Sequence, residues 1–302
     1  MTIKNQGQIV AVLHDFVQSH AWNRASDRVK ALAKIHVIDG FAAILAGAGL
    51  TPAGIEVKRL FCGPRTGAGN TERDIHYCAQ QAYGYALSGR LSSFDDVQTT
   101  ETGTYGLLGN PTVPVLAAVL AVAQAKRASG QAMLDAYLAS VEVTARLAGG
   151  TVPMNLANRI SATTTFGGIG AILAAGNLLG LNRTEVIAAF DLWQLLVPMA
   201  PLDYDSPINV AHRDAHSVRM AVEAVIDAKR GVRADPTFFG PLSLVAENAV
   251  LSLSRRLGKP YFIQEPGFAI RVYPSDPLTH PAIDATLAII NVHGIDHCEI
   301  ER

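Results

Sequence analysis

The stretch from Thr165 to Leu179 constrains the fold more than any other part of this chain. It carries no charged residue and is rich in glycine and alanine, with small residues at Gly167, Gly168, Gly170, Ala171, Ala174, Ala175 and Gly176. The distance between two packed helices depends on the side chains at their contact, so small residues allow a close approach. We therefore expect a helix here, at the centre of a helical array.

Other parts of the chain repeat their apolar residues with the period of an α-helix. The helix expected at residues 29–47 places Val29, Ala33, Val37 and Ile44 near one face, and Gly47 and Gly49 are expected to end it. Pro111 suits the first turn of a helix, where its missing N–H has no partner to lose. Further helices are expected at residues 73–92, 111–128, 131–149, 182–193 and 216–229.

The character of the chain changes near residue 259. Residues 259–275 are rich in proline, glycine, aromatic and β-branched residues, which is typical of loop and strand. A short helix is expected at 280–293, and residues 297–302 resemble the start of a strand. The sequence therefore predicts a mainly α protein, with an all-helical domain at 1–262 and an incomplete α+β segment at 263–302.

Composition narrows the class of protein. Apolar residues are 49% of the 302 residues and charged residues only 17%, which indicates a large buried interior. The net charge is −1 without a long basic tract, so no nucleic acid or anionic membrane is expected as a partner. The three cysteines are far apart, the N-terminus lacks a signal-peptide pattern, and apolar runs such as 113–123 are too short to span a bilayer. These features predict a cytoplasmic protein.

The chain contains five notable motifs in this order: RLSSFDDVQ (90–98), GNPTVPVLAAVLAVA (109–123), TTTFGGIGA (163–171), IRVYPS (270–275) and HPAIDA (280–285). Taken together in their order and spacing, these motifs resemble the MmgE/PrpD family. That family contains 2-methylcitrate dehydratases, cis-aconitate decarboxylases and an iminodisuccinate epimerase. The resemblance runs from about residue 30 to the last residue, and implies a large all-helical domain with an α+β lid, usually in a homodimer. It also implies activity on small di- and tricarboxylates without a metal or an organic cofactor.

Chemistry next to a carboxylate needs a base, an acid, and cationic or N–H groups that hold the anionic oxygens. Where the resemblance places such residues, this chain departs from the family pattern. An aspartate is replaced by Ser93, two histidines by Asn110 and Ser161, and a lysine by Arg271. A further lysine falls near Val210, where the alignment is loose and His212 or Arg213 could serve.

The adjacent carboxylates Asp95 and Asp96 are candidates for a base or for a group that orients a histidine. Their alternative role is a solvated turn or a helix cap. Asn110 could donate to a substrate carboxylate or cap the helix that Pro111 begins. Ser161 and Thr163 could hold an anion at a helix N-terminus, and simple capping explains the same hydroxyls.

His212 and His216 are four residues apart, which places both on one face of a helix. Proton transfer or carboxylate binding by one of them is a hypothesis, whereas a metal pair lacks a third ligand, so no metal is expected. Arg271 can bind a carboxylate through two parallel hydrogen bonds, or it can form a surface ion pair. The expected catalytic residues are thus Asp95, Asp96, His212 and His216, and the expected substrate-binding residues are Asn110, Ser161, Thr163 and Arg271.

Two functions fit these residues. The first is a cofactor-independent lyase or isomerase of a small carboxylate with an altered catalytic set. The second is a catalytically degenerate relative that acts as a dimer partner or regulator. A homodimer is expected in either case, because an incomplete lid leaves strand edges and apolar residues uncovered: Ile270, Val272, Ile289 and Ile290.

Overall fold

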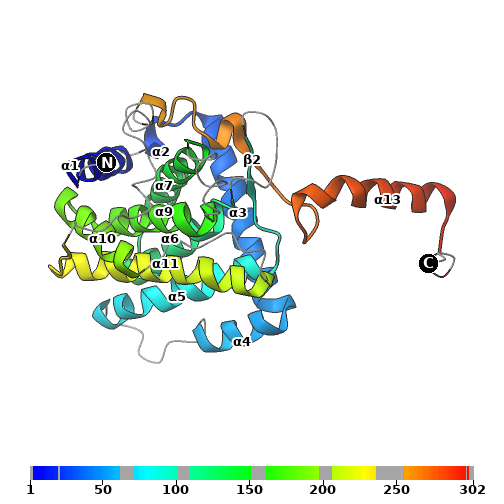
Figure 1. Ribbon diagram of the computed structural model, residues 1–302, viewed down its shortest axis with the longest axis horizontal. Helices are drawn as coiled ribbons and strands as arrows, with labels where there is room; N and C mark the ends of the chain where they lie inside the picture. The colour runs from blue at the N-terminus through cyan, green and yellow to red at the C-terminus, as the bar shows by residue number, and fades with distance from the viewer. Residues whose placement is uncertain are drawn as a thin grey trace.

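The protein is mainly helical, as the sequence predicts (Figure 1). The computed structural model describes residues 3–19, 21–61, 71–100, 109–150, 161–196, 206–235, 253, 255–296 and 298. Its α-helices are α1 (Ile3–Val17), α2 (Ala21–Arg24), α3 (Asp27–Leu50), α4 (Pro52–Phe61), α5 (Thr71–Leu91), α6 (Thr112–Lys126), α7 (Gly130–Gly150), α9 (Ala162–Leu179), α10 (Arg183–Leu196), α11 (Pro207–Lys229) and α13 (His280–His293). Helices α5, α6, α7, α9, α10 and α13 confirm six predicted helices.

Helix α9 is the central helix of the body, as its glycines and alanines predict. It packs against α6, α7 and α11, and its residues from Ala162 to Gly176 are buried. An added Cβ at Gly167 would lie 2.8 Å from Pro114 of α6, and one at Gly170 would lie 2.1 Å from the Thr144 hydroxyl of α7. Larger side chains at these positions would push the neighbouring helices apart.

The structure corrects two predicted helix ends. Helix α3 does not end at Gly47 or Gly49 but continues to Leu50. Gly47 serves packing instead, because a Cβ there would lie 1.7 Å from the carbonyl oxygen of Ser88 in α5. Helix α11 begins at Pro207 rather than at His216, since a proline fits the first turn of a helix.

The buried face of α3 also differs from the predicted one. Val29, Ala33 and Ile44 are buried as expected, but the next position on that face is His36, and Val37 is only half-buried. Helix α3 therefore carries a histidine into the interior, where an apolar residue was expected.

A buried ion pair of α7 binds the chain segment at residues 258–262. Arg146 donates from Nε to Glu142 over 2.9 Å, and Glu142 accepts from the backbone N–H groups of Gly258 and Phe262. Arg146 also donates to the carbonyl oxygen of Pro260. These contacts hold residues 258–262 against α7. They therefore help to position the segment that follows, which carries Arg271.

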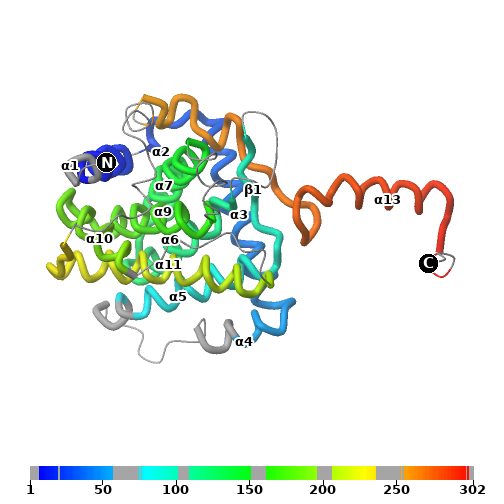
Figure 2. The backbone as a smooth tube through the Cα atoms, viewed as in Figure 1, coloured from blue at the N-terminus to red at the C-terminus, as the bar shows by residue number. Residues whose placement is uncertain are grey.

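The last elements form a small sheet and a projecting helix. Strand β1 (Val97–Gln98) pairs with β2 (Phe268–Ala269) in antiparallel register. The π-helical turn η2 (Ile263–Gly267) precedes β2, and the 3₁₀ turn η3 (Pro277–Thr279) precedes α13. Helix α13 extends away from the helical body, and the chain trace ends beyond it (Figure 2). The strand expected at 297–302 lies outside the described residues apart from Cys298, and the domain boundary at 262 stays a prediction.

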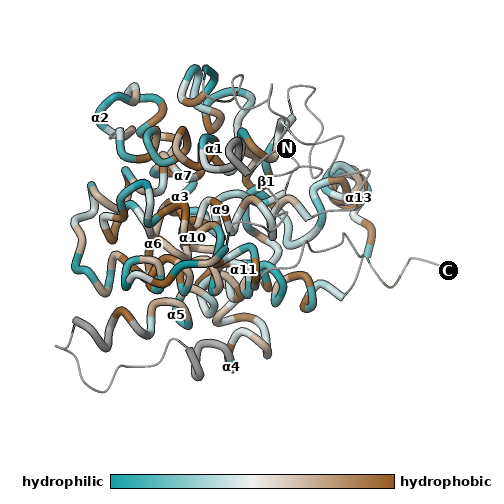
Figure 3. Tube along the Cα trace, turned by 60° about the vertical axis from the view of Figure 1, so that its left-hand side comes forward, coloured by the Kyte–Doolittle hydropathy of each residue, from teal (hydrophilic) through white to brown (hydrophobic). Residues whose placement is uncertain are grey.

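Hydrophobic segments gather in the middle of the body, around α9 and α10, and hydrophilic segments lie mostly at its periphery (Figure 3). Two described helices, α3 and α9, are long and apolar enough to cross a membrane by length and composition alone. The expectation that apolar runs are too short is therefore wrong for these two. A helix in the core of a helical bundle meets the same test, and α9 is buried in this way, because 83% of its apolar window is buried inside the protein.

Candidate active site

Asp95 and Asp96 lie inside the protein rather than in a solvated turn. Both carboxylates have no exposed surface. Asp95 forms ion pairs with Arg90 of α5 and with Arg271, whose Nη2 lies 3.6 Å from Asp95 Oδ1. Burial without a cation would be costly for a carboxylate, so the two guanidiniums are what allows Asp95 to occupy this position.

Asp96 caps helix α6. Its Oδ1 accepts from the backbone N–H of Thr112 over 3.2 Å, and its Oδ2 accepts from the Thr112 hydroxyl over 2.5 Å. A carboxylate at a helix N-terminus is stabilised by the unpaired N–H groups there. The Oδ2 atom also lies 3.1 Å from Nδ1 of His36 on α3. Asp96 thus joins α3 to α6, and the helix-cap alternative fits its contacts.

Arg90 links the carboxylates to α11. Its Nε donates to Asp214 over 2.8 Å, and Asp214 also accepts from the Thr164 hydroxyl at the start of α9 over 2.5 Å. Burial alone would lower the pKa of Arg90, but Asp95 and Asp214 raise that pKa above its usual value. Burial raises the pKa of Asp214, against the effect of Arg90. Helices α3, α5, α6, α9 and α11 therefore meet at one buried cluster of charges.

Arg271 sits where this cluster reaches a pocket. Its side chain is 10% exposed, and Nη1 donates to the carbonyl oxygens of Ser93 and Ser275 over 3.0 and 3.1 Å. Its Nε has no hydrogen-bond partner among the described residues. Burial lowers the pKa of Arg271, opposed by Asp95. The pocket has a volume of about 250 Å³ and is lined by Val97, Ala269, Ile270, Arg271, Pro277, His280, Pro281 and Asp284.

Asn110, Ser161 and Thr163 come together at the start of α9, next to Asp96. The Asn110 side chain donates to the carbonyl oxygen of Asp96 over 2.7 Å, and its backbone N–H donates to the Thr163 hydroxyl over 3.0 Å. Ser161 caps α9 by accepting from the N–H of Thr164 over 3.2 Å. The capping alternative thus accounts for Ser161, and Asn110 holds the Asp96 backbone. Substrate binding by these three residues stays a prediction.

His212 and His216 do not face this cluster. Each is two residues from Asp214 on α11, about 200° around the helix axis, so they lie on the opposite side from the residue that binds Arg90. The Tyr83 hydroxyl of α5 lies 2.6 Å from His212 Nδ1, and the His216 ring centre lies 4.9 Å from the Tyr83 ring centre. Burial, Arg219 and His212 lower the pKa of His216. A catalytic role for the two histidines would therefore require a site on the other side of α11, away from the cluster around Arg90.

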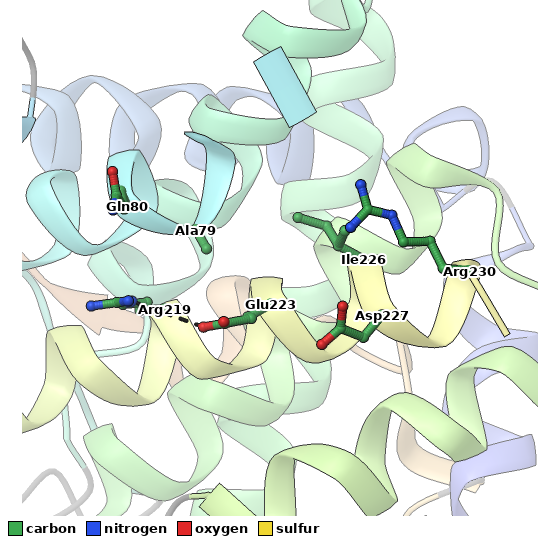
Figure 4. Close-up of a pocket in the computed structure, with 7 residues that line it drawn as sticks. All are labelled: Ala79, Gln80, Arg219, Glu223, Ile226, Asp227 and Arg230. Atoms are coloured by element: carbon green, nitrogen blue, oxygen red, sulfur yellow. Dashed lines mark ion pairs between the residues drawn. The ribbon is translucent and has the colours of Figure 1, made fainter. Parts of the chain in front are cut away.

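A separate small pocket lies between α5 and α11 (Figure 4). It has a volume of about 190 Å³, and its charged residues come from α11 and from Arg230, which follows the helix, with Arg219 and Glu223 forming an ion pair of 3.9 Å. Oppositely charged side chains line it together, so it offers no preference for an anion. Its lining residues are Ala79, Gln80, Arg219, Glu223, Ile226, Asp227 and Arg230.

The sequence reasoning missed several residues of the cluster. Asp214 lies between the two histidines, and it falls on the buried face of α11 with Ala211 and Val218. A carboxylate on an apolar helix face indicates a buried charge, so the sequence pattern of this helix could have identified Asp214. Arg90 is only five residues from Asp95, but the tertiary structure alone brings it to Asp214, which is 124 residues further along the chain.

Comparison with protein families matches residues 11–241 to the MmgE/PrpD N-terminal domain. The chain belongs to the MmgE/PrpD family. The family includes carboxylic-acid dehydratases and decarboxylases. The matched region begins earlier than the motifs suggest and contains Asp95, Asp96, Arg90 and Asp214, whereas Arg271 lies after it. Comparison with curated proteins finds no match to this chain.

Proposed function

We propose that this protein is a cofactor-independent lyase or isomerase that acts on a small di- or tricarboxylate. The observation that carries the proposal is Arg271. Two backbone carbonyls and Asp95 hold its guanidinium in place, the buried Nε has no hydrogen-bond partner among the described residues, and the residue lines a pocket. A guanidinium held in this way has the charge to pair with a substrate carboxylate and the N–H groups to donate hydrogen bonds to its oxygens.

Membership of a family that includes carboxylic-acid dehydratases and decarboxylases supports the same substrate class. The pocket volume of about 250 Å³ suits a small molecule, and apolar residues such as Val97 and Ile270 line it beside the charged Arg271. Such a pocket would exclude water from one side of a bound carboxylate and so strengthen its pairing with the arginine.

Replacing Arg271 by alanine should weaken the binding of a carboxylate by about 1.5–3 kcal/mol, the worth of a hydrogen bond to a charged group. The measurement is calorimetric titration of the wild type and the variant with citrate, 2-methylcitrate, cis-aconitate and itaconate. Arg183→Ala is the matched control, because Arg183 pairs with Asp15 on the surface. A wild type that binds and turns over none of the four acids would contradict the proposed activity.

A second function has one observation in its favour. Asn110 and Ser161 occupy positions where the family pattern has histidines, and their side chains are engaged by the Asp96 backbone and by Thr164. In a catalytically degenerate member that acts as a dimer partner or regulator, these structural hydrogen bonds would be the whole role of Asn110 and Ser161. Carboxylate binding by the wild type without turnover would favour this second function.

We also propose that the protein works as a cytoplasmic homodimer, in which α13 and the segment before it contact a second copy. Ile270, Val272 and Ile289 are exposed, as expected, together with Leu287 and Val292, whereas Ile290 is half-buried. An apolar surface of this kind favours association.

The change Ile289→Asp should convert the dimer into a monomer, because it places a charge in the apolar contact. Light scattering at micromolar concentration measures the mass. Ile38→Asp, which introduces the same charge on the exposed face of α3, is the matched control and should leave the dimer intact. A monomeric wild type would contradict the proposal, and a monomer only with Ile38→Asp would move the contact to α3.

A further inference from the structure

The pocket that Arg271 lines also contains a carboxylate. Asp284, one helical turn after His280 on α13, is among the residues that line it. Asp95 contacts Arg271 as well, but it is fully buried and out of reach of a ligand. Asp284 is an exposed residue, so a molecule in solution can reach it directly. The pocket therefore presents both a cation and a carboxylate to a ligand.

Tyr273 holds Asp284 in place and leaves part of its carboxylate unoccupied. The Tyr273 hydroxyl donates to Oδ1 of Asp284 over 2.5 Å, and the Tyr273 ring packs edge-on against His280, with 5.2 Å between the ring centres. Oδ2 of Asp284 has no protein partner among the described residues. A carboxylate only accepts hydrogen bonds, so this oxygen is available to a donor group of a ligand.

Arg271 and Asp284 do not neutralise each other. The ion-pair partner of Arg271 in the described part of the chain is Asp95, not Asp284. The pocket between α5 and α11 differs, because its Arg219 and Glu223 pair with each other. Separate charges in a pocket of about 250 Å³ can bind two different groups of one small molecule and so fix its orientation.

A hydrogen-bonded turn fixes the two charged groups of the pocket relative to each other. Arg271 donates from Nη1 to the carbonyl oxygen of Ser275 over 3.1 Å, and the hydroxyl oxygens of Ser275 and Thr279 lie 2.9 Å apart. Asp276 caps the turn η3 by accepting from the backbone N–H of Leu278 over 2.9 Å. Because Thr279 directly precedes α13, the spacing of the two charged groups is set before a ligand arrives, which lowers the entropy cost of binding.

We propose that the pocket binds a carboxylic acid that also carries a protonated amine, and that Asp284 selects for this amine. This inference rests on the proposed function, because the carboxylate of the ligand pairs with Arg271. An ammonium group carries a positive charge and three N–H donors, so it pairs with the free oxygen of Asp284 and is repelled by Arg271. A second carboxylate at the same place would be repelled by Asp284, so any further carboxylate of the ligand must point away from it.

Succinate, malate and aspartate test the proposal, because these acids differ at one position only. Succinate has hydrogen there, malate has a hydroxyl, and aspartate has an amine that is protonated at neutral pH. In calorimetric titration of the full chain, aspartate should bind about fivefold more tightly than succinate, the upper range for an exposed ion pair, and more tightly than malate. Equal affinities for aspartate and succinate, or a preference for malate, would overturn the assignment.

The change Asp284→Asn should remove the preference for aspartate. Asparagine keeps an oxygen that accepts from Tyr273 but loses the charge, so aspartate should fall to about the affinity of succinate, and succinate should bind no more weakly than before. Asp27→Asn is the matched control, because it removes one negative charge from an exposed position on α3 outside the pocket. It should keep the preference. An unchanged preference in Asp284→Asn would show that another group selects the amine, and the assignment fails.

The outcomes separate this inference from the proposed function. If succinate, malate and aspartate bind equally and Arg271→Ala weakens all of them, the carboxylate site stands and the role of Asp284 is wrong. If the wild type binds none of these acids and none of the tricarboxylates and dicarboxylates named for the proposed function, both fail. If Asp284→Asn does not fold, the wild-type ranking of the acids decides, since it needs no variant.

Discussion

Replacing Arg90 by methionine should lower the free energy of unfolding by about 3–5 kcal/mol, the typical cost of removing one partner from a buried ion pair. Methionine keeps much of the length of the side chain but leaves Asp95 and Asp214 buried without this guanidinium. Urea unfolding of the wild type and the variant at neutral pH measures the difference. The loss should shrink as the pH falls, because protonation of Asp214, whose pKa burial raises, removes one of the buried charges that Arg90 balanced.

The double change Arg90→Met with Asp214→Asn is the companion variant. It removes one carboxylate together with the cation, so it should recover part of the lost stability. Arg183→Ala, which breaks the exposed pair with Asp15, should leave the unfolding midpoint almost unchanged. If Arg90→Met unfolds within about 1 kcal/mol of the wild type, the cluster is not the electrostatic centre that its contacts indicate.

Replacing Trp193 by alanine should lower the free energy of unfolding by about 3–5 kcal/mol, the usual range for truncating a buried aromatic side chain. Trp193 of α10 is fully buried, and its Nε1 donates to the carbonyl oxygen of Ser217 over 3.1 Å. The indole fills space that Gly168 of α9 leaves open, since a Cβ there would lie 2.3 Å from the ring. Denaturant unfolding followed by circular dichroism measures the loss.

Two comparisons show whether the loss comes from the cavity. Trp193→Phe removes less volume and should be less harmful than Trp193→Ala. Leu195→Ala truncates an exposed side chain on the same helix and should have little effect. Gly168→Ala approaches the same contact from the other side and should also destabilise, by overpacking. Equal stability of the Trp193→Ala variant and the wild type would show that α9 and α10 do not depend on this contact.

Helix predictions were confirmed where the pattern of neighbouring residues determines the helix. The glycines and alanines of 165–179 fit only a closely packed helix, and Pro111 marks the start of α6 to within a residue. The failures at Gly47 and His36 have a different origin. Gly47 looks like a helix end, but it is a point of contact with Ser88 of α5, which no local pattern encodes. His36 is buried because Asp96 and Phe268 approach it from elsewhere in the chain.

The residues of the candidate site also fall into those that local motifs predict and those that they do not. Asp95, Asp96, Asn110, Ser161, Thr163 and Arg271 were predicted from the motifs, and the structure gathers them around one buried cluster. His212 and His216 were predicted to face it, and the helix geometry of α11 turns them away. Arg90 and Asp214 were missed, because they are 124 residues apart in the sequence and only the tertiary structure pairs them.

By itself, the sequence determined the helical class, the position of most helices, the central place of α9 and the membership of the MmgE/PrpD family. These properties follow from periodicity, residue size and local motifs, which act over a few residues. The tertiary structure alone decided which charges are buried together. A pKa or an ion pair depends on every charge within a few ångströms and on the water excluded around it, so Arg90 and Asp214 acquire their properties only when α5, α9 and α11 have packed.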